Sequence, residues 1–144
     1  MPAISRTSLR ILVVQDEPIT RELLAHLLRM GGYEVLCADT GEHALMTMRK
    51  WRGRIDCLFT GIKLPGLVDG WILADEFHVS NPLRPIIYAS ENDADYRWRM
   101  PDTAFVRAPV SPIEVLERVK LMTEPVFEAD SPASSEPLPV LMAS

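Results

Sequence analysis

The sequence predicts an α/β protein in which a doubly wound, five-stranded parallel sheet lies between two layers of helices. Short apolar runs alternate with stretches of helical periodicity along residues 9–122. Runs that are apolar at consecutive positions are typical of strands buried on both faces. Because strands that alternate with helices are joined by right-handed crossovers, the pattern indicates a three-layer αβα sandwich.

Five strands and four helices are expected from this pattern. The strands are residues 11–14, 35–38, 57–60, 85–89 and 104–106, and the helices are residues 19–30, 42–52, 71–79 and 112–122. In the first helix Ile19, Leu23, Leu24, Leu27 and Leu28 recur at helical spacing. Gly31 and Gly32 end that helix, and Ser111 followed by Pro112 begins the last one. The connection over residues 90–103 is too short for a full crossover, so it holds a short or irregular fourth helix.

Charge and composition divide the chain of 144 residues into three parts. Residues 124–144 contain four acidic side chains and no Lys or Arg, which leaves 15 basic and 16 acidic side chains in residues 1–123. We therefore expect an N-terminal extension at residues 1–8, a domain at 9–123 and an acidic Pro/Ser-rich arm at 124–144.

Composition also excludes several classes of protein. No apolar run approaches the roughly 18 residues of a membrane span, and the first ten residues lack the apolar core of a secretory signal. A net charge of -5 argues against binding nucleic acid through phosphate neutralisation. Cys37 and Cys57 lie in apolar runs, which predicts buried, reduced thiols in a cytoplasmic protein.

In a doubly wound sheet, functional groups gather at the carboxyl ends of the strands. The segments expected there are Gln15-Asp16-Glu17 after the first strand, Gly61 after the third, Ser90 after the fourth and Arg107-Ala108-Pro109 after the fifth.

Several short motifs, in this order and spacing, resemble the receiver domains of bacterial response regulators, which have the chemotaxis-type, flavodoxin-like fold. The motifs are Ile11-Leu-Val-Val-Gln-Asp-Glu-Pro18, Gly32-Tyr-Glu-Val35, Thr40-Gly-Glu-His-Ala-Leu45, Lys63-Leu-Pro-Gly66 with Asp69-Gly70, Pro85-Ile-Ile87 and residues 105–109. The resemblance covers residues 9–122.

The resemblance implies a phosphorylation pocket in which several key groups are missing. Family receivers phosphorylate an aspartate at the end of the third strand, hold Mg²⁺ on an acidic pair after the first strand, and bind the phosphoryl group through a Ser or Thr and a Lys. Here Gly61 stands at the phosphoacceptor position, Gln15 and Asp16 at the acidic pair, Ser90 at the hydroxyl, Ala108 at the lysine, and Phe105 at the switch aromatic.

The substitutions have direct chemical consequences. Gly61 has no carboxylate, so no acyl phosphate forms there, and Ala108 removes the cation that would pair with phosphate. Asp16 alone provides at most a weak site for Mg²⁺, a hard ion that prefers carboxylate oxygens. Arg107 does not replace the lysine, because adjacent strand residues point to opposite faces. We therefore expect a degenerate receiver that is not an enzyme and needs no cofactor.

Simpler structural roles remain open for several of these residues. Asp16 either keeps a residual metal-binding role, or caps a helix or forms local hydrogen bonds. Ser90 either binds phosphate or forms a turn. Asp69 is expected to cap a helix rather than to replace the acceptor. The three histidines, His26, His43 and His78, are expected at solvated or half-buried helix positions.

Two segments are candidate interaction surfaces. Tyr96 and Trp98 lie among arginines, a composition typical of either a contact surface or a loop packed on its own core. Leu138, Val140, Leu141 and Met142 form an apolar cluster at the end of the arm, which favours a homodimer made through the arm. Arg107 is a further candidate.

The predicted function is that of an atypical, stand-alone response regulator in two-component phosphorelay signalling. It acts in the cytoplasm by binding a sensor histidine kinase or another signalling protein, with no nucleic acid or membrane as partner. One alternative is a receiver that is phosphorylated at another residue. A flavodoxin-like ligand-binding protein or enzyme is a weaker alternative, because it needs a Gly-rich phosphate loop, whereas the segment from Gln15 to Pro18 is acidic.

Overall fold

The computed structural model describes residues 8–92 and 103–123, and every structural statement below concerns those residues. Along the chain the elements are β1 (Arg10–Val14), α1 (Pro18–Met30), β2 (Glu34–Ala38), α2 (Gly41–Lys50), β3 (Cys57–Gly61), α3 (Gly70–Ser80), β4 (Ile86–Ser90), β5 (Thr103–Arg107) and α4 (Pro112–Thr123). The strands form one parallel sheet in the order β2-β1-β3-β4-β5, which confirms the predicted fold class.

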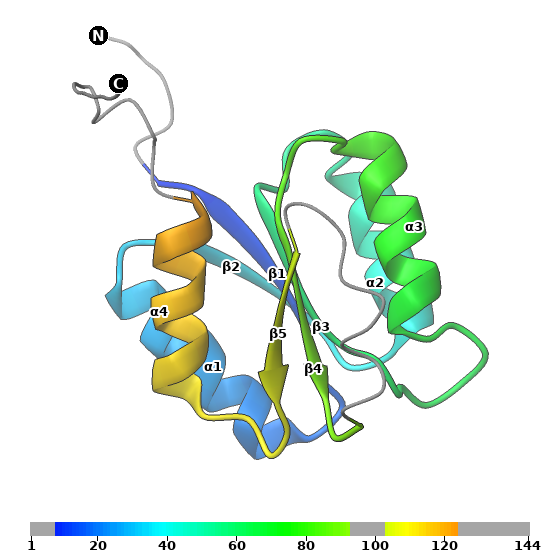
Figure 1. Cartoon of the computed structure of the whole chain (residues 1–144). Helices are drawn as coiled ribbons and strands as arrows, with labels where there is room; N and C mark the ends of the chain where they lie inside the picture. Colours follow the sequence, from blue (N-terminus) through cyan, green and yellow to red (C-terminus); the bar gives the residue numbers. More distant parts are fainter. Residues whose placement is uncertain (1–7, 93–102, 124–144) are drawn as a thin grey trace, which may run out of the picture.

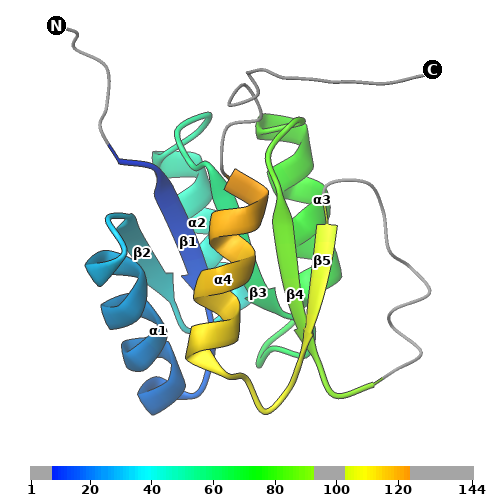
Figure 2. The same cartoon turned by 60° about the vertical axis from the view of Figure 1, so that its left-hand side comes forward.

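Helices cover both faces of the sheet, α2 and α3 on one face and α1 with α4 on the other (Figure 1; Figure 2). Alternate residues of each central strand enter opposite cores, because successive side chains of a strand point to opposite faces. Leu12 packs in the core with α2 and α3, whereas Ile11 packs in the core with α1 and α4.

The strands are slightly longer than the sequence predicts. Gly61, Ser90 and Arg107 were expected beyond the strands, but each is the last residue of its strand. Gly61 is paired with Ala89, and Ser90 with Arg107. These backbone positions are therefore fixed by the ladder of the sheet rather than by loops.

The first helix buries a narrower face than its apolar pattern indicates. Leu24 and Leu28 are buried, but Ile19 is 69% exposed and Leu23 is 50% exposed. Both side chains lie away from the cores, because α1 is covered only where it meets the sheet and α4, and a helix turns by about 100° at each residue.

Of the two thiols, only Cys57 is fully buried, and burial raises its pKa to about 12. Cys37 is half-buried because it lies on β2, the edge strand of the sheet. The prediction of two buried thiols is therefore wrong for Cys37.

Charged groups pin the amino ends of β1 and β3. The guanidinium of Arg10 donates to the Glu34 carboxylate at 2.7 and 3.0 Å and lies 4.3 Å from the centre of the Trp51 ring. The Asp56 carboxylate accepts the backbone N–H of Arg10 at 2.7 Å and lies 3.5 Å from the guanidinium of Arg84. A buried carboxylate needs such partners to offset the loss of its hydration.

The sequence also predicts where the domain ends and how β4 is connected to β5. The folded elements run from Arg10 to Thr123, and the expected extension and acidic arm lie mostly or wholly outside the described residues. The short or irregular helix expected within residues 90–103 falls on 93–102, which are also outside them. No helix in the described part of the chain is long and apolar enough to cross a membrane.

Close contact between β3 and α3 depends on a glycine at the start of the helix. A Cβ atom on Gly70 would overlap the carbonyl oxygen of Gly61 and lie 2.8 Å from the Cα of Ile62, both of them backbone atoms. Gly70→Ala should therefore lower the free energy of unfolding by about 1–3 kcal/mol, as overpacking does, measured by urea denaturation.

The matched control is Gly61→Ala, because a Cβ there meets nothing nearer than 3.6 Å. This variant should be unchanged or more stable by up to about 1 kcal/mol, since alanine is preferred to glycine in a strand. Equal destabilisation of the two variants would contradict the close contact as the cause.

Candidate functional site

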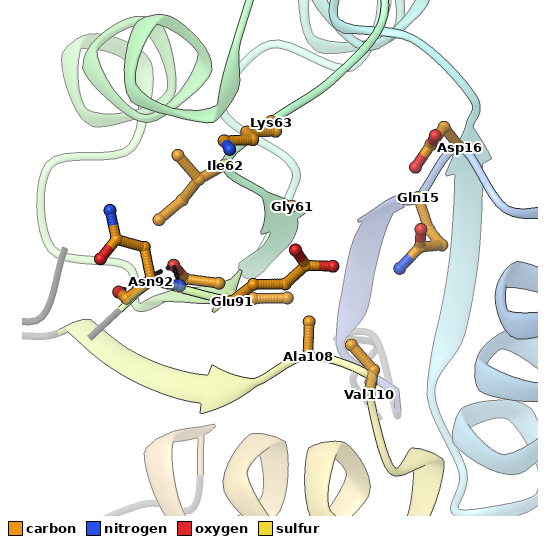
Figure 3. Close-up of a pocket in the computed structure, with 11 residues that line it drawn as sticks. Gln15, Asp16, Gly61, Ile62, Lys63, Glu91, Asn92, Ala108 and Val110 are labelled. Atoms are coloured by element: carbon orange, nitrogen blue, oxygen red, sulfur yellow. Dashed lines mark hydrogen bonds between the residues drawn. The ribbon is translucent and has the colours of Figure 1, made fainter. Parts of the chain in front are cut away.

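A cavity of about 170 Å³ opens at the carboxyl edge of the sheet (Figure 3). Its lining comes from the ends of β1, β3, β4 and β5 and the segments that follow them: Gln15, Asp16, Gly61, Ile62, Lys63, Ala89, Ser90, Glu91, Asn92, Ala108 and Val110. All five predicted pocket positions are in this set. They converge because the parallel strands end at the same edge.

Gly61 is not required there by backbone geometry or by crowding. The nearest atoms to a Cβ at this position are Leu64 Cδ2 at 3.6 Å and Lys63 O at 3.7 Å, which are ordinary van der Waals distances. A residue with a side chain can therefore start at position 61 without displacing its neighbours. Position 61 therefore carries no carboxylate although the space around it would accept a side chain.

The segment after β1 is organised by Glu17 and not by Asp16. Glu17 caps α1, because its carboxylate accepts the N–H and the hydroxyl of Thr20 at 2.8 and 2.9 Å, and these bonds hold the pKa of Glu17 below its ordinary value. The expectation that Asp16 caps a helix is wrong, since the cap falls one residue later. Asp16 is exposed at the rim of the pocket.

The side chain and the backbone of Gln15 each accept a hydrogen bond from a nearby residue. Its side-chain Oε1 accepts the N–H of Glu17 at 3.2 Å, and its carbonyl oxygen accepts a bond from Arg21 at 2.8 Å. Besides this amide oxygen, the cavity lining carries the carboxylates of Asp16 and Glu91 as oxygen ligands of the kind that a hard cation prefers. No group of three or more His, Cys, Asp or Glu side chains suited to a metal ion occurs within residues 8–92 and 103–123.

The Ser90 hydroxyl forms a turn at the end of β4. It accepts the N–H of Asn92 at 3.0 Å and lies 3.2 Å from the Asn92 carbonyl oxygen. The same side chain lines the pocket. The turn role expected for Ser90 is therefore present, and it leaves the hydroxyl at the cavity wall.

Sequence reasoning missed two charged groups in the pocket, Glu91 and Lys63. Figure 3 shows the Glu91 side chain reaching from the end of β4 into the space between Gly61 and Ala108. Lys63 lines the same cavity from the segment after β3. Each lies within two residues of a predicted pocket position, and this closeness in sequence was the signal that could have identified them.

The segment that carries Lys63 is tied to α2 by Glu42. The Glu42 carboxylate accepts the N–H of Leu67 at 2.9 Å, and this bond is the main reason that the pKa of Glu42 lies below its ordinary value. Below that pKa the carboxylate is protonated and the bond weakens, so the anchor operates at neutral pH.

Ala108 presents only a methyl group to the pocket. Its backbone N–H donates to the Ser90 carbonyl oxygen at 2.9 Å, which fixes its position beside β4, and the peptide bond to Pro109 is cis. Arg107 is exposed and does not line the cavity. This agrees with the expectation that the adjacent residues Arg107 and Ala108 point to opposite faces.

Phe105 belongs to an aromatic cluster beside the pocket rather than to its lining. Its ring stacks on Tyr88 at 5.0 Å between centroids, and Trp71 lies 4.8 Å from Tyr88. Burial, with a smaller effect of the Asp75 charge, raises the pKa of Tyr88 to about 12. Trp71 packs on the core at the start of α3.

The three histidines are not part of the pocket lining, and the candidate contact residues lie outside the described residues. His26, His43 and His78 are exposed on helices, and His43 lies 3.2 Å from the carboxylate of Asp39, whose pKa it lowers. The proposed contact residues Tyr96, Trp98, Leu138, Val140, Leu141 and Met142 fall outside the described ranges.

The fold and this pocket define a receiver-type domain, and comparison with known proteins agrees. Residues 11–104 match the family model described as "Response regulator receiver domain", so the chain belongs to that family. It is a receiver domain of two-component signalling.

Named relatives place it among response regulators. The chain is 32% identical to "Transcriptional regulatory protein AruR" of Pseudomonas aeruginosa over 130 residues, which are 86% of this chain and 53% of the relative. It is 31% identical to "Phosphate regulon transcriptional regulatory protein PhoB" of the same species, over 88% of this chain and 56% of the relative. The chain thus spans about half the length of these relatives.

Solved structures share the same architecture. The receiver domain of the hybrid histidine kinase CckA is 33% identical with a TM-score of 0.70, covering 80% of this chain and 99% of that one. A response regulator receiver protein from Sinorhizobium medicae has a TM-score of 0.75 at 22% identity, covering 83% of this chain and 97% of the other, and shows the fold alone.

Asp69 is engaged at the start of α3, as predicted. Its carboxylate accepts the N–H of Ile72 at 2.9 Å. Asp69→Ala should reduce the free energy of unfolding by about 1 kcal/mol, while Asp69→Asn, which keeps an accepting oxygen, should stay close to wild type. Urea denaturation distinguishes the two, and an equal loss in both variants would contradict capping as the role of Asp69.

Proposed function

We propose that this protein is an atypical response regulator that works by protein–protein interaction without phosphorylation at position 61. It is not an enzyme in this proposal, and it acts in the cytoplasm as a partner of a sensor histidine kinase or another signalling protein. The observation that carries the proposal is the glycine at the carboxyl end of β3, in the wall of the pocket.

Two losses on facing sides of the pocket support this proposal. Gly61 provides no carboxylate to accept a phosphoryl group, and Ala108 provides no cation to hold one. A single loss at Gly61 would leave a basic group for an anion. The paired loss removes both the acceptor and the binding group.

The charge of the lining also supports it. Glu91 and Asp16 contribute two carboxylates to the cavity against one ammonium group, that of Lys63. A carboxylate beside the vacant acceptor position disfavours a phosphate-like anion through like-charge repulsion. The bound state of the protein would then follow the concentration of its partners rather than a phosphorylation cycle.

Phosphorylation with acetyl phosphate and Mg²⁺, followed by intact-mass spectrometry, tests the proposal. The wild type should gain no phosphoryl group. The triple variant Gln15→Asp/Gly61→Asp/Ala108→Lys should gain one, because position 61 has room for a side chain. The matched control, Gln15→Asp/Gly61→Ala/Ala108→Lys, restores the cation without the acceptor and should stay unmodified.

A phosphoryl group on the wild type would overturn the proposal. Peptide mapping of that species would then identify the residue and favour a receiver that takes phosphate elsewhere. Pull-down with candidate sensor kinases complements the assay, since binding should be equal with and without acetyl phosphate. A tenfold change in affinity on adding acetyl phosphate would also contradict a phosphate-independent interaction.

We also propose that the protein forms a homodimer through the arm. The apolar cluster Leu138, Val140, Leu141 and Met142 at the end of an otherwise polar segment supports this, because an exchanged arm closes a twofold dimer. Sedimentation should give a dimer for the full chain and a monomer after deletion of residues 124–144. An unchanged oligomeric state after the deletion would refute the arm as the dimer contact.

A further inference from the structure

Two adjoining hollows lie at the amino edge of the sheet, opposite the pocket. One, of about 420 Å³, is lined by residues that include Leu9, Leu83, Pro85 and Met122. The other, of about 430 Å³, shares Leu83 and Arg84 with the first and extends past the end of α3. We name the two together the amino-edge groove. Its lining residues lie where the strands begin and α3 and α4 end. This end of the sheet is at the top in Figure 1.

The walls of the amino-edge groove combine apolar and basic groups. Leu83 is 84% exposed, a large apolar side chain left uncovered at the centre of the groove. The Arg84 side chain is 50% exposed and has five N–H donors, of which its contact with Asp56 engages one nitrogen. Among the described lining residues Asp56 is the only acidic one, and it is buried with Arg10 and Arg84 as partners.

The chain itself leaves α4 at this groove. Thr123, the last residue of α4, lines it, and its hydroxyl donates to the Val119 carbonyl oxygen at 2.6 Å and lies 3.3 Å from the Tyr33 hydroxyl. The next residues, Glu124-Pro-Val-Phe-Glu-Ala-Asp130, combine three carboxylates with one aromatic side chain. Pro125 lacks the N–H of a helical hydrogen bond, which disfavours continuation of α4 through it.

We propose that residues 124–130 of this chain fold back onto the amino-edge groove of the same molecule. Phe127 lies against Leu83 and Met122, and Glu128 or Asp130 pairs with Arg84. The reach is sufficient, since the four residues from Thr123 to Phe127 extend up to about 14 Å from a residue that already lines the groove.

The carboxylates of this segment complement the positive charge around the amino-edge groove. Carboxylates directly beyond the end of a helix are disfavoured by the helix dipole, so they need a nearby cation, and Arg84 supplies one. The exposed Arg52 and Arg54, which flank Gly53 of the groove, add positive charge on the same side. A segment with no Lys or Arg of its own brings no repulsion to these groups.

Amide NMR spectra of the full-length protein test the proposal. Phe127→Ser should shift the amide signals of Leu9, Leu83 and Arg84, because it removes the aromatic ring from the groove. Leu141→Ser is the matched control, an apolar residue of the same arm that should leave those three signals unchanged. Both substitutions lie outside the folded elements and leave the core intact.

A second variant tests the charged contacts. Glu128→Gln/Asp130→Asn should shift the Arg84 side-chain Nε–H signal in the same direction as high salt does, because both weaken pairing with carboxylates. Each effect should be the same over a hundredfold range of protein concentration.

Three results would overturn the proposal. Unchanged Leu9, Leu83 and Arg84 signals in Phe127→Ser would show that the segment does not occupy the groove. Equal shifts from Leu141→Ser would remove its specificity. Shifts that disappear on dilution would assign the groove to the arm of a second copy, an outcome distinct from failure of the proposed dimer contact at residues 138–142.

Discussion

The parallel pairing of β1 with β3 at the centre of the sheet is the constraint on which the rest of this molecule depends. The register Val14 with Thr60 places Gln15 and Gly61 at the same height, so the carboxyl ends of both strands open on one cavity. At the other end, the bond from the Arg10 N–H to Asp56 holds the same two segments together. Helices can then cover both faces, because each central strand presents apolar side chains to each core.

The two cores of the fold do not depend on a carboxylate at position 61 or a cation at position 108. The cores are apolar and lie above and below the sheet, and the pocket at its carboxyl edge shares Ile62 and Ala89 with them. A cluster of carboxylates at such an edge would add like-charge repulsion rather than stability. Gly61 and Ala108 are therefore compatible with a stable domain.

The two edges of the sheet carry different kinds of groups. The carboxyl edge has the helix N-terminal ends, with Glu17 and Asp69 as caps, and the cavity that defines the family site. The amino edge has the helix C-terminal ends and the charged network of Arg10, Asp56 and Arg84. The pocket and the chain's own acidic segment at the amino-edge groove would therefore lie at opposite ends of the domain.

By itself, the sequence determined the order of the strands and helices, the cap at Asp69 and the convergence of Gln15, Gly61, Ser90 and Ala108. These follow from local periodicity, capping and the rule that parallel strands end at one edge. Only the tertiary structure decided that Glu17 rather than Asp16 caps α1, that Glu91 and Lys63 enter the pocket, and that Leu83 lies uncovered beside Thr123. Such features depend on which residues distant in sequence pack together, and no local pattern of side chains specifies that.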